Sequence, residues 1–222
     1  MATLRLVGIL GGTFNPIHFG HLRSAQELAE LLNMDEVRFI PSANPPHKPL
    51  PTVSAQQRAS MVQLAIANNP LFSCDTRELN RQGASYTIDT LMSLRQDLGA
   101  ETALCLIMGS DAFLHLDSWH RWQDLLNYCH IVLVQRPIIG TQKDLSSLSL
   151  SPVLKDFLAQ HYTENCEDLS DKNAGFISMH AITPLAISAT EIRKLIAQKQ
   201  SPRYLLPNAV LDFIVKNTLY TQ

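Results

Sequence analysis

Short apolar runs alternate with segments of helical periodicity along most of the chain. Runs rich in aliphatic and β-branched residues, each closed by Gly, Pro or a polar residue, predict buried strands. They lie at about residues 4–10, 36–40, 71–74, 104–108, 130–135 and 175–180. Apolar residues spaced three and four apart predict amphipathic helices between them. These span about residues 19–34, 54–68, 88–98, 112–116, 152–161 and 207–215, and a further helix opens at residue 188.

Strands that alternate with helices at this spacing form βαβ units, which imply parallel strands and right-handed crossovers. We therefore predict an α/β fold, a Rossmann-like open parallel sheet with helices on both faces. The chain has 222 residues and shows no internal repeat or long linker, so we predict a single domain over residues 1–222. Residues 138–173 are interpreted as an insertion within that domain.

The most informative stretch joins the first predicted strand to the first predicted helix. Residues 11–21 read Gly-Gly-Thr-Phe-Asn-Pro-Ile-His-Phe-Gly-His. Ligands of open α/β sheets bind at such joints, where glycines allow close approach and helix N–H groups attract anions. His18 and His21 can face one side and hold the oxygens of a reacting phosphate. The alternative is a tight turn with two ordinary histidines.

A second candidate phosphate site opens the helix at residue 188. Ser188 and Glu191 have the spacing of a capping box, so Ser188 can serve simply as a helix cap. A helix N-terminus that carries Ser188 and Thr190, with Arg193 one turn further, is also a site for phosphate. The two interpretations are compatible, because the cap shapes the binding end.

Residues 13–21 and 187–193 together resemble the two signatures of the nucleotidyltransferase superfamily that carries a His-x-Gly-His motif. They occur in the expected order, and each opens a predicted helix. One position departs from the family pattern, because Asn15 stands where Asp is usual. Asn keeps a hydrogen-bonding oxygen and the turn preference but lacks the charge.

Three further segments resemble the bacterial nicotinate-mononucleotide adenylyltransferases within that superfamily. These are Pro-Pro-His-Lys at residues 45–48, Ser-Tyr-Thr at residues 85–87, and Trp119. The resemblance implies that Lys48 approaches the nucleotide phosphates and that Trp119 stacks on the nicotinate ring. It also implies that residues 85–87 contact the pyridine mononucleotide. By their chemistry alone, the hydroxyl residues before the 88–98 helix are read as an N-cap, and Trp122 as a core residue.

Two other strand ends carry polar groups. Gly109 and Asp111 follow the 104–108 strand, where Gly allows close approach and Asp111 could bind a ribose hydroxyl, a lysine or a hydrated magnesium ion. The alternative for Asp111 is an N-cap of the 112–116 helix. Arg136 follows the 130–135 strand, before a proline, and could pair with a phosphate in bidentate fashion.

The resemblance implies transfer of AMP from ATP to nicotinate mononucleotide, which gives nicotinate adenine dinucleotide and pyrophosphate in NAD biosynthesis. His18 and His21 are the catalytic candidates. The ATP-binding candidates are Gly11, Gly12, Thr13, Phe14, His18, His21, Gly109, Asp111, Ile187, Ser188, Thr190 and Arg193. The candidates for binding nicotinate mononucleotide are Lys48, Ser85, Tyr86, Thr87, Trp119 and Arg136. We expect Mg²⁺ to bind mainly through the substrate phosphates, without a protein metal site.

Two other functions stay open at this point. One is a sibling adenylyl- or cytidylyltransferase, for instance one that acts on phosphopantetheine, which would leave residues 85–87 and Trp119 without a purpose. The other is a non-catalytic nucleotide-binding sensor, for which Asn15 is the single argument. The chain carries neither Gly-x-Gly-x-x-Gly at the first joint nor a Walker A loop, so the dinucleotide fingerprint and the P-loop are both excluded.

The charge, apolar runs and cysteines of the chain limit the kinds of binding partner that we expect. The formal net charge is −2 and no basic stripe is evident, so we expect no nucleic-acid partner. No apolar run reaches the length of a membrane span, so we expect no membrane partner. The four cysteines are widely spaced without Cys-x-x-Cys and predict buried reduced thiols in a cytoplasmic protein. No prediction of the oligomeric state follows.

Overall fold

The fold is built on one parallel sheet. The structure, a computed structural model, describes residues 3–45, 51–135 and 150–221. The strands are β1 (Arg5–Gly12), β2 (Glu36–Pro41), β3 (Phe72–Cys74), β4 (Thr102–Gly109), β5 (His130–Gln135) and β6 (Ile177–Ala181). They lie in the order β3-β2-β1-β4-β5-β6, and every neighbouring pair is parallel. The predicted Rossmann-like sheet is therefore confirmed.

The strand order reverses between β1 and β4. The chain first builds outward from β1 to β2 and β3, and then crosses back to place β4 on the other side of β1. In register, Val7 of β1 lies between Glu36 of β2 and Leu104 of β4. With right-handed crossovers on both sides, the connecting helices diverge to opposite faces. A crevice is thereby left at the carboxyl ends of β1 and β4.

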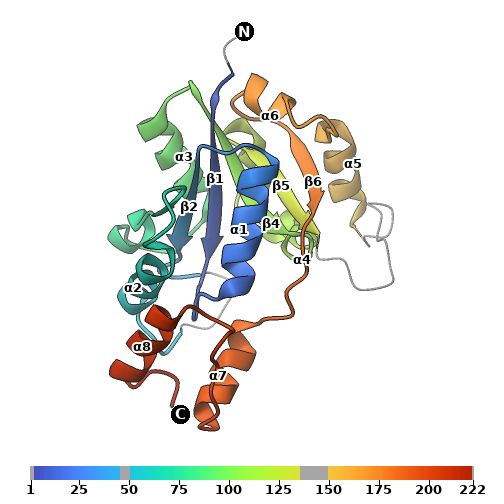
Figure 1. The fold of residues 1–222 in the computed structure, drawn as a ribbon. Helices are drawn as coiled ribbons and strands as arrows, with labels where there is room; N and C mark the ends of the chain where they lie inside the picture. Colours follow the sequence, from blue (N-terminus) through green and yellow to red (C-terminus); the bar gives the residue numbers. More distant parts are fainter. Residues whose placement is uncertain (1–2, 46–50, 136–149, 222) are drawn as a thin grey trace.

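Helices cover both faces of the sheet, as predicted. They are α1 (Phe19–Leu31), α2 (Ala55–Ile66), α3 (Thr87–Leu98), α4 (Ser110–Phe113), α5 (Pro152–His161), α6 (Asp168–Asp171), α7 (Ala189–Ala197) and α8 (Asn208–Lys216). Successive strand residues point to opposite faces, so Leu6 joins the core under α1 and α2, whereas Val7 and Ile9 join the core under α3 and α5. Figure 1 shows α7 and α8 beyond the carboxyl end of β1.

Helix starts follow local cap chemistry. Ser54 forms a complete capping box with Gln57 at the start of α2. Ser151 caps α5, with Pro152 at the first helical position. The first helix ends at Leu31, three residues before the predicted end, because Asn33 adopts a left-handed conformation that α-helix geometry excludes.

The range predicted as an insertion contributes to the core where the structure describes it. Helices α5 and α6 lie within residues 150–173, beside β6 in Figure 1. Leu154 and Leu158 of α5 and Leu169 of α6 are buried. These helices therefore cover the sheet. None of the described helices is both long and apolar enough to cross a membrane.

The cysteines only partly match the prediction of buried thiols. All four are free; Cys105 and Cys129 are buried, Cys74 is half-buried and Cys166 is exposed. Burial raises the pKa of the Cys129 thiol to about 12 and that of the Cys105 thiol further still. Both strand-associated thiols are therefore protonated at neutral pH. For Cys166 the prediction is wrong, because it precedes the short surface helix α6.

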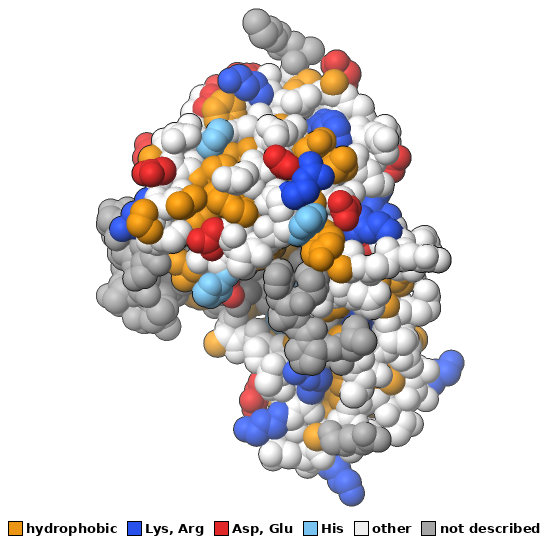
Figure 2. Space-filling view, turned by 180° about the vertical axis from the view of Figure 1, so that it is seen from behind, with side chains coloured by type: hydrophobic (Ala, Val, Ile, Leu, Met, Phe, Trp, Pro, Cys, Tyr) orange, Lys and Arg blue, Asp and Glu red, His pale blue; other side chains and the backbone are white. Residues whose placement is uncertain are grey.

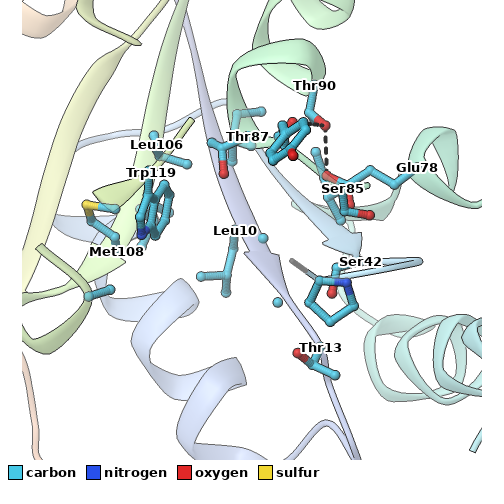
Figure 3. Close-up of a pocket in the computed structure, with 18 of the residues that line it drawn as sticks. Leu10, Thr13, Ser42, Glu78, Ser85, Thr87, Thr90, Leu106, Met108 and Trp119 are labelled. Atoms are coloured by element: carbon cyan, nitrogen blue, oxygen red, sulfur yellow. Dashed lines mark hydrogen bonds between the residues drawn. The ribbon is translucent and has the colours of Figure 1, made fainter. Parts of the chain in front are cut away.

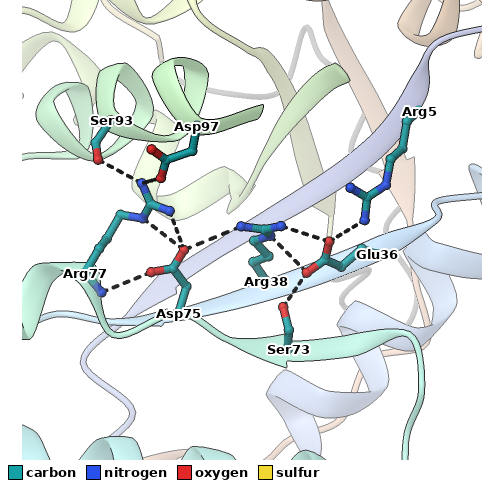
Figure 4. A network of polar contacts seen from close by, with 8 residues as sticks. All are labelled: Arg5, Glu36, Arg38, Ser73, Asp75, Arg77, Ser93 and Asp97. Atoms are coloured by element: carbon teal, nitrogen blue, oxygen red, sulfur yellow. Dashed lines mark hydrogen bonds and ion pairs between the residues drawn. The ribbon is translucent and has the colours of Figure 1, made fainter. Parts of the chain in front are cut away.

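Ion pairs connect β1, β2, β3 and α3 at the β3 side of the sheet (Figure 4). Glu36 receives Arg5 at 2.6 Å and Arg38 at 2.9 Å, and Asp75 pairs with Arg77 at 2.7 Å. Burial raises the pKa of Glu36, but hydrogen bonds from Ser73 and Arg38 outweigh it and leave the pKa below its usual value. The network therefore links neighbouring strands on this side of the sheet to one another and to α3 through side chains.

The surface shows no single dominant charge on the face opposite α1. Figure 2 shows hydrophobic side chains gathered on the upper part of that face, with Lys, Arg, Asp and Glu scattered around them. Among the described residues seen in that view, positive side chains form no continuous stripe. The absence of a nucleic-acid partner stays a prediction.

The amino ends of β4 and β5 are fixed by a half-buried arginine and a buried histidine. Arg95 donates to the carbonyls of Gly99, Thr102, Tyr128 and Asn173 at 2.5–2.9 Å. The fully buried His130 accepts the Phe176 N–H on Nδ1, so its Nε2 carries the proton and donates to the Lys172 carbonyl at 2.8 Å. Burial lowers the pKa of His130 from 6.5 to about 4.

This histidine makes stability depend on pH. Between pH 6.5 and about 4 the unfolded chain takes up a proton that folded His130 does not. We therefore expect its contribution to stability to be complete above pH 6.5 and to fall by about 3 kcal/mol as the pH drops through that window. Denaturant unfolding of the wild type and of His130→Gln at pH 7, 6 and 5 measures this. The stability advantage of the wild type should shrink as the pH falls, and parallel curves would contradict the assignment.

Candidate active site

A pocket of about 710 Å³ opens at the carboxyl ends of β1 and β4, where the strand order reverses. It is bounded by the loops that follow β1, β2 and β4 and by the start of α3. Figure 3 shows Trp119 and Met108 on one side, Ser85 and Glu78 on the other, and Leu10 of β1 between them. The lining includes these predicted residues: Gly11, Gly12, Thr13, Ser85, Tyr86, Thr87, Gly109, Asp111, Trp119 and His21.

The joint between β1 and α1 carries the two histidines. His18 is the N-cap residue of α1 and only 3% exposed, and His21 lies in the first turn. Their rings lie side by side, with centroids 3.8 Å apart and planes inclined by 31°. A Cβ at Gly20 would lie 3.0 Å from the His18 ring and 3.5 Å from the Ile187 carbonyl oxygen. Gly20 therefore lets the histidines and the second signature pack closely.

The Phe14 ring packs against the His21 ring of this pair. It is buried, packs edge-on against His21 with centroids 5.2 Å apart, and contacts Phe39 of β2. Phe14 has a positive φ of 45°, which turns the chain sharply between Gly12 and the helix. Of the predicted ATP-binding residues, Phe14 therefore has its side chain in the core, so only its backbone is placed to meet a ligand.

Arg193 of the second signature forms a hydrogen bond to the first signature. Ser188 caps α7 by accepting the N–H of Glu191 at 3.1 Å, so the predicted cap is confirmed. Arg193 donates to the Asn15 carbonyl at 2.8 Å and to the Thr190 hydroxyl at 3.3 Å. Ile187, Ser188, Thr190 and Arg193 lie beside the histidine joint, outside the pocket lining itself. The α7 N-terminus and the joint thus form one polar rim.

Residues 85–87 form one wall of the pocket, and the Ser85 hydroxyl stabilises it without capping α3. Helix α3 begins at Thr87, and Tyr86 precedes it without a side-chain cap. The Ser85 Oγ instead accepts the N–H groups of Ala43 and Asn44, each at 3.1 Å. For Ser85 the N-cap alternative is therefore wrong, because the loop after β2 provides competing donors. Ser85 ties that loop to the start of α3.

The two tryptophans are both half-buried but have different neighbours. Trp119 lines the pocket, whereas Trp122 packs edge-on against Phe157 of α5 with centroids 5.0 Å apart. Both come from the segment after β4, where short 3₁₀ helices at Leu116–Ser118 and Trp122–Asn127 turn the chain sharply. An indole face is therefore available to a flat ring at the pocket wall.

Asp111 sits at the exposed edge of the pocket. Helix α4 begins at Ser110 with Gly109 as the N-cap residue, so the N-cap alternative for Asp111 is wrong. Its carboxylate folds back over Gly109, where a Cβ would lie 2.3 Å from Asp111 Oδ1. Gly109 is thus needed for this approach.

The sequence did not single out three polar residues of the pocket, Glu78, Thr90 and His120. Glu78 is only 7% exposed, accepts the Thr90 hydroxyl at 2.7 Å, and is also in hydrogen-bonding contact with Ser85. Burial raises the pKa of Glu78, which these hydroxyls and Arg81 partly offset. The His120 ring stacks on Tyr86 with centroids 4.4 Å apart. The alternating charges of Asp75, Arg77, Glu78 and Arg81 are typical of a solvated edge, so the sequence pattern gives no sign of a buried carboxyl.

Two predicted residues are not placed. Lys48 and Arg136 lie outside the described residues. Within the described part of the chain, no group of three or more His, Cys, Asp or Glu side chains could hold a metal ion. The described pocket therefore offers a histidine and backbone rim suited to phosphate, and an aromatic wall beside it suited to a flat ring.

Comparisons with known proteins identify the family. The sequence model of the family described as cytidylyltransferase-like matches residues 9–195. A protein of Aeromonas salmonicida named probable nicotinate-nucleotide adenylyltransferase is 48% identical over 214 residues, which cover 96% of each chain. One of Pseudomonas entomophila with the same name is 48% identical over 217 residues, covering 98% of this chain and 95% of the relative.

Solved structures show the same fold. The nicotinic acid mononucleotide adenylyltransferase of Plasmodium falciparum, complexed with NaAD, superposes with a TM-score of 0.70 at 18% identity and 97% coverage of both chains. The same enzyme complexed with APC gives a TM-score of 0.68 at 16% identity and the same coverage. The chain therefore belongs to the cytidylyltransferase-like family of nucleotidyltransferases, as one of its nicotinate-nucleotide adenylyltransferases.

Proposed function

We propose that the pocket between β1 and β4 is where this enzyme joins its two substrates, with His18 and His21 at the reacting phosphate. The reaction transfers AMP from ATP to nicotinate mononucleotide and gives nicotinate adenine dinucleotide and pyrophosphate, in NAD biosynthesis. One observation carries the assignment. A single pocket at the reversal of strand order is lined both by the histidine joint and by Trp119 with residues 85–87.

The transfer requires no covalent intermediate between the protein and the AMP group. An oxygen of the mononucleotide phosphate attacks the α-phosphorus of ATP, and the bond from that phosphorus to the bridging oxygen breaks. Pyrophosphate leaves with the electron pair. The attacking oxygen is already deprotonated at neutral pH, so no general base is needed. Catalysis then consists of alignment and of stabilising the charge that develops at the α-phosphate.

The histidine joint fits that task. Gly11, Gly12 and Thr13 allow the backbone to approach the triphosphate. His21, which lines the pocket, is assigned to the transition-state charge. The buried His18 is assigned to a phosphate contact and to holding the His21 ring against it.

The α7 N-terminus is assigned to the leaving group. Ser188 and Thr190 stand at a helix start, where N–H groups and the helix dipole favour anions. Arg193 is already positioned by the Asn15 carbonyl, which leaves further donors of its guanidinium for the β- and γ-phosphates. Ile187 would contribute through its backbone.

A magnesium ion fits this site through the substrate. Asp111 is an exposed carboxylate in the pocket lining. Mg²⁺ binds in such sites through substrate phosphates, water and one or two carboxylates. When bound, it neutralises charge on the departing pyrophosphate. Asp111 is assigned to a water-mediated contact with it, or to a ribose hydroxyl, alongside Gly109.

The opposite wall is assigned to nicotinate mononucleotide. Trp119 offers its indole face to the pyridine ring, and the start of α3 at Thr87 offers N–H groups to the nicotinate carboxylate. Ser85 and Tyr86 shape this wall. Lys48 and Arg136 keep their predicted roles at the mononucleotide phosphate.

The acceptor identifies the reaction most directly. We expect pyrophosphate release from MgATP with nicotinate mononucleotide, and much slower release with nicotinamide mononucleotide or phosphopantetheine. A coupled pyrophosphate assay with the three acceptors at equal concentration measures it. Preference for phosphopantetheine would retain the histidine chemistry and reject the pyridine wall. No release from folded protein that binds ATP would favour a nucleotide sensor.

His21→Ala tests the catalytic assignment. We expect turnover to fall at least ~100-fold, because a donor to the developing charge is lost, whereas ATP affinity and thermal stability should change little. Steady-state kinetics, ATP titration and a melting curve measure the three quantities. His21→Asn retains a side-chain donor and should be intermediate. Near-normal turnover in folded His21→Ala would reject the role.

Trp119→Ala tests the pyridine wall. We expect KM for nicotinate mononucleotide to rise about tenfold, because stacking on a ring is worth roughly 1–3 kcal/mol, while KM for ATP stays within about twofold. Trp119→Phe keeps an aromatic face and should recover most of the affinity. An unchanged acceptor KM in Trp119→Ala would place the ring elsewhere.

A further inference from the structure

The segment that follows α8 returns to the loop that carries the histidines. Leu219 is buried beside the core under α1 and α2. The next residue, Tyr220, donates its phenol hydroxyl to Asn15 Oδ1 at 2.7 Å. The two residues are 205 positions apart in the chain. Asn15 in turn lies three positions before His18.

Asn15 belongs to the first signature motif and accepts hydrogen bonds both from the second motif and from Tyr220. Its side-chain oxygen accepts Tyr220, and its backbone carbonyl accepts Arg193 of α7 at 2.8 Å. The carbonyl of Leu205 also accepts the N–H of Phe19, the first residue of α1. The chain after β6 therefore contacts the histidine joint at Asn15, before His18, and at Phe19, directly after it.

A buried arginine also forms a hydrogen bond to the same loop. Arg58 of α2 is only 1% exposed and donates to the carbonyls of Thr13 at 2.6 Å and Ser42 at 2.7 Å. Burial raises the pKa of the Tyr220 phenol, and the nearby Arg193 and Arg58 guanidiniums offset this only partly. Tyr220 therefore keeps its proton at neutral pH and remains the donor to Asn15.

We propose that Tyr220 is a positioning residue for adenylyl transfer, because its hydroxyl fixes Asn15 and thereby the loop that places His18 and His21. The loop spans only residues 13–17 between the strand and the N-cap histidine. A shift of its middle residue is therefore passed to the imidazoles. Small displacements of groups that stabilise a transition state reduce the rate without unfolding the protein. The proposal rests on the proposed roles of the two histidines.

Tyr220→Phe removes only the hydroxyl, so the packing of the ring is retained. We expect kcat to fall about tenfold, because a shifted loop places the imidazoles less well to stabilise the transition state, while KM for nicotinate mononucleotide stays within twofold. The matched control is Tyr204→Phe, which deletes the same hydroxyl from a side chain that is 86% exposed. The control should retain wild-type kcat.

A double-mutant cycle separates positioning from general loss of stability. If Tyr220 acts through Asn15, Asn15→Ala and the double variant Asn15→Ala/Tyr220→Phe should have similar kcat values, because the second change removes nothing further. All rates are measured per folded protein, with melting curves for each variant. Additive effects of the two substitutions, or kcat of Tyr220→Phe within twofold of wild type, would overturn the proposal.

The experiment also distinguishes this proposal from the catalytic assignment. If His21→Ala is inactive while Tyr220→Phe is normal, the histidine role stands and the positioning role is rejected. If His21→Ala is active, the premise of the proposal fails, whatever the rate of Tyr220→Phe. Slow Tyr220→Phe, slow His21→Ala and a non-additive cycle together support it.

Discussion

The site depends on one topological constraint, the reversal of strand order between β1 and β4. The helices that follow the two strands pack into different cores, α1 into one and α4 into the other, and so diverge from the carboxyl ends between them. The histidine joint follows β1, and β4 ends at Gly109, two residues before Asp111. Under the proposed function, two substrates that must react with each other are received from the two halves of the sheet into this one pocket.

Guanidinium groups on backbone carbonyls stabilise both ends of this sheet. Arg95 holds four carbonyls at the amino ends of β4 and β5, and Arg58 holds Thr13 and Ser42 at the carboxyl ends of β1 and β2. A planar group with five donors can fix several loops at once. Arg193 does the same for Asn15. The loops around the pocket are therefore held by side chains from helices, which favours a site formed before substrate binds.

The strands, most helix starts and the strand-to-helix joint at residues 11–21 could be predicted because they depend on neighbouring residues. Strand runs, the Ser54 and Ser151 caps and the 11–21 stretch all have local signals. The contacts of Glu78, Arg58 and Tyr220 could not be predicted, since their partners lie 12, 45 and 205 positions away. Ser85 was open to two interpretations for the same reason: its partners belong to the loop after β2.

The most direct test of the account is a crystal structure of the enzyme with its dinucleotide product. The account predicts the nicotinate ring against Trp119 and the start of α3, and the bridging phosphates beside His21, with the adenosine half towards Gly109 and Asp111. A dinucleotide bound away from the carboxyl ends of β1 and β4, or with its phosphates out of reach of His21, would contradict the central claim that this pocket joins the two substrates.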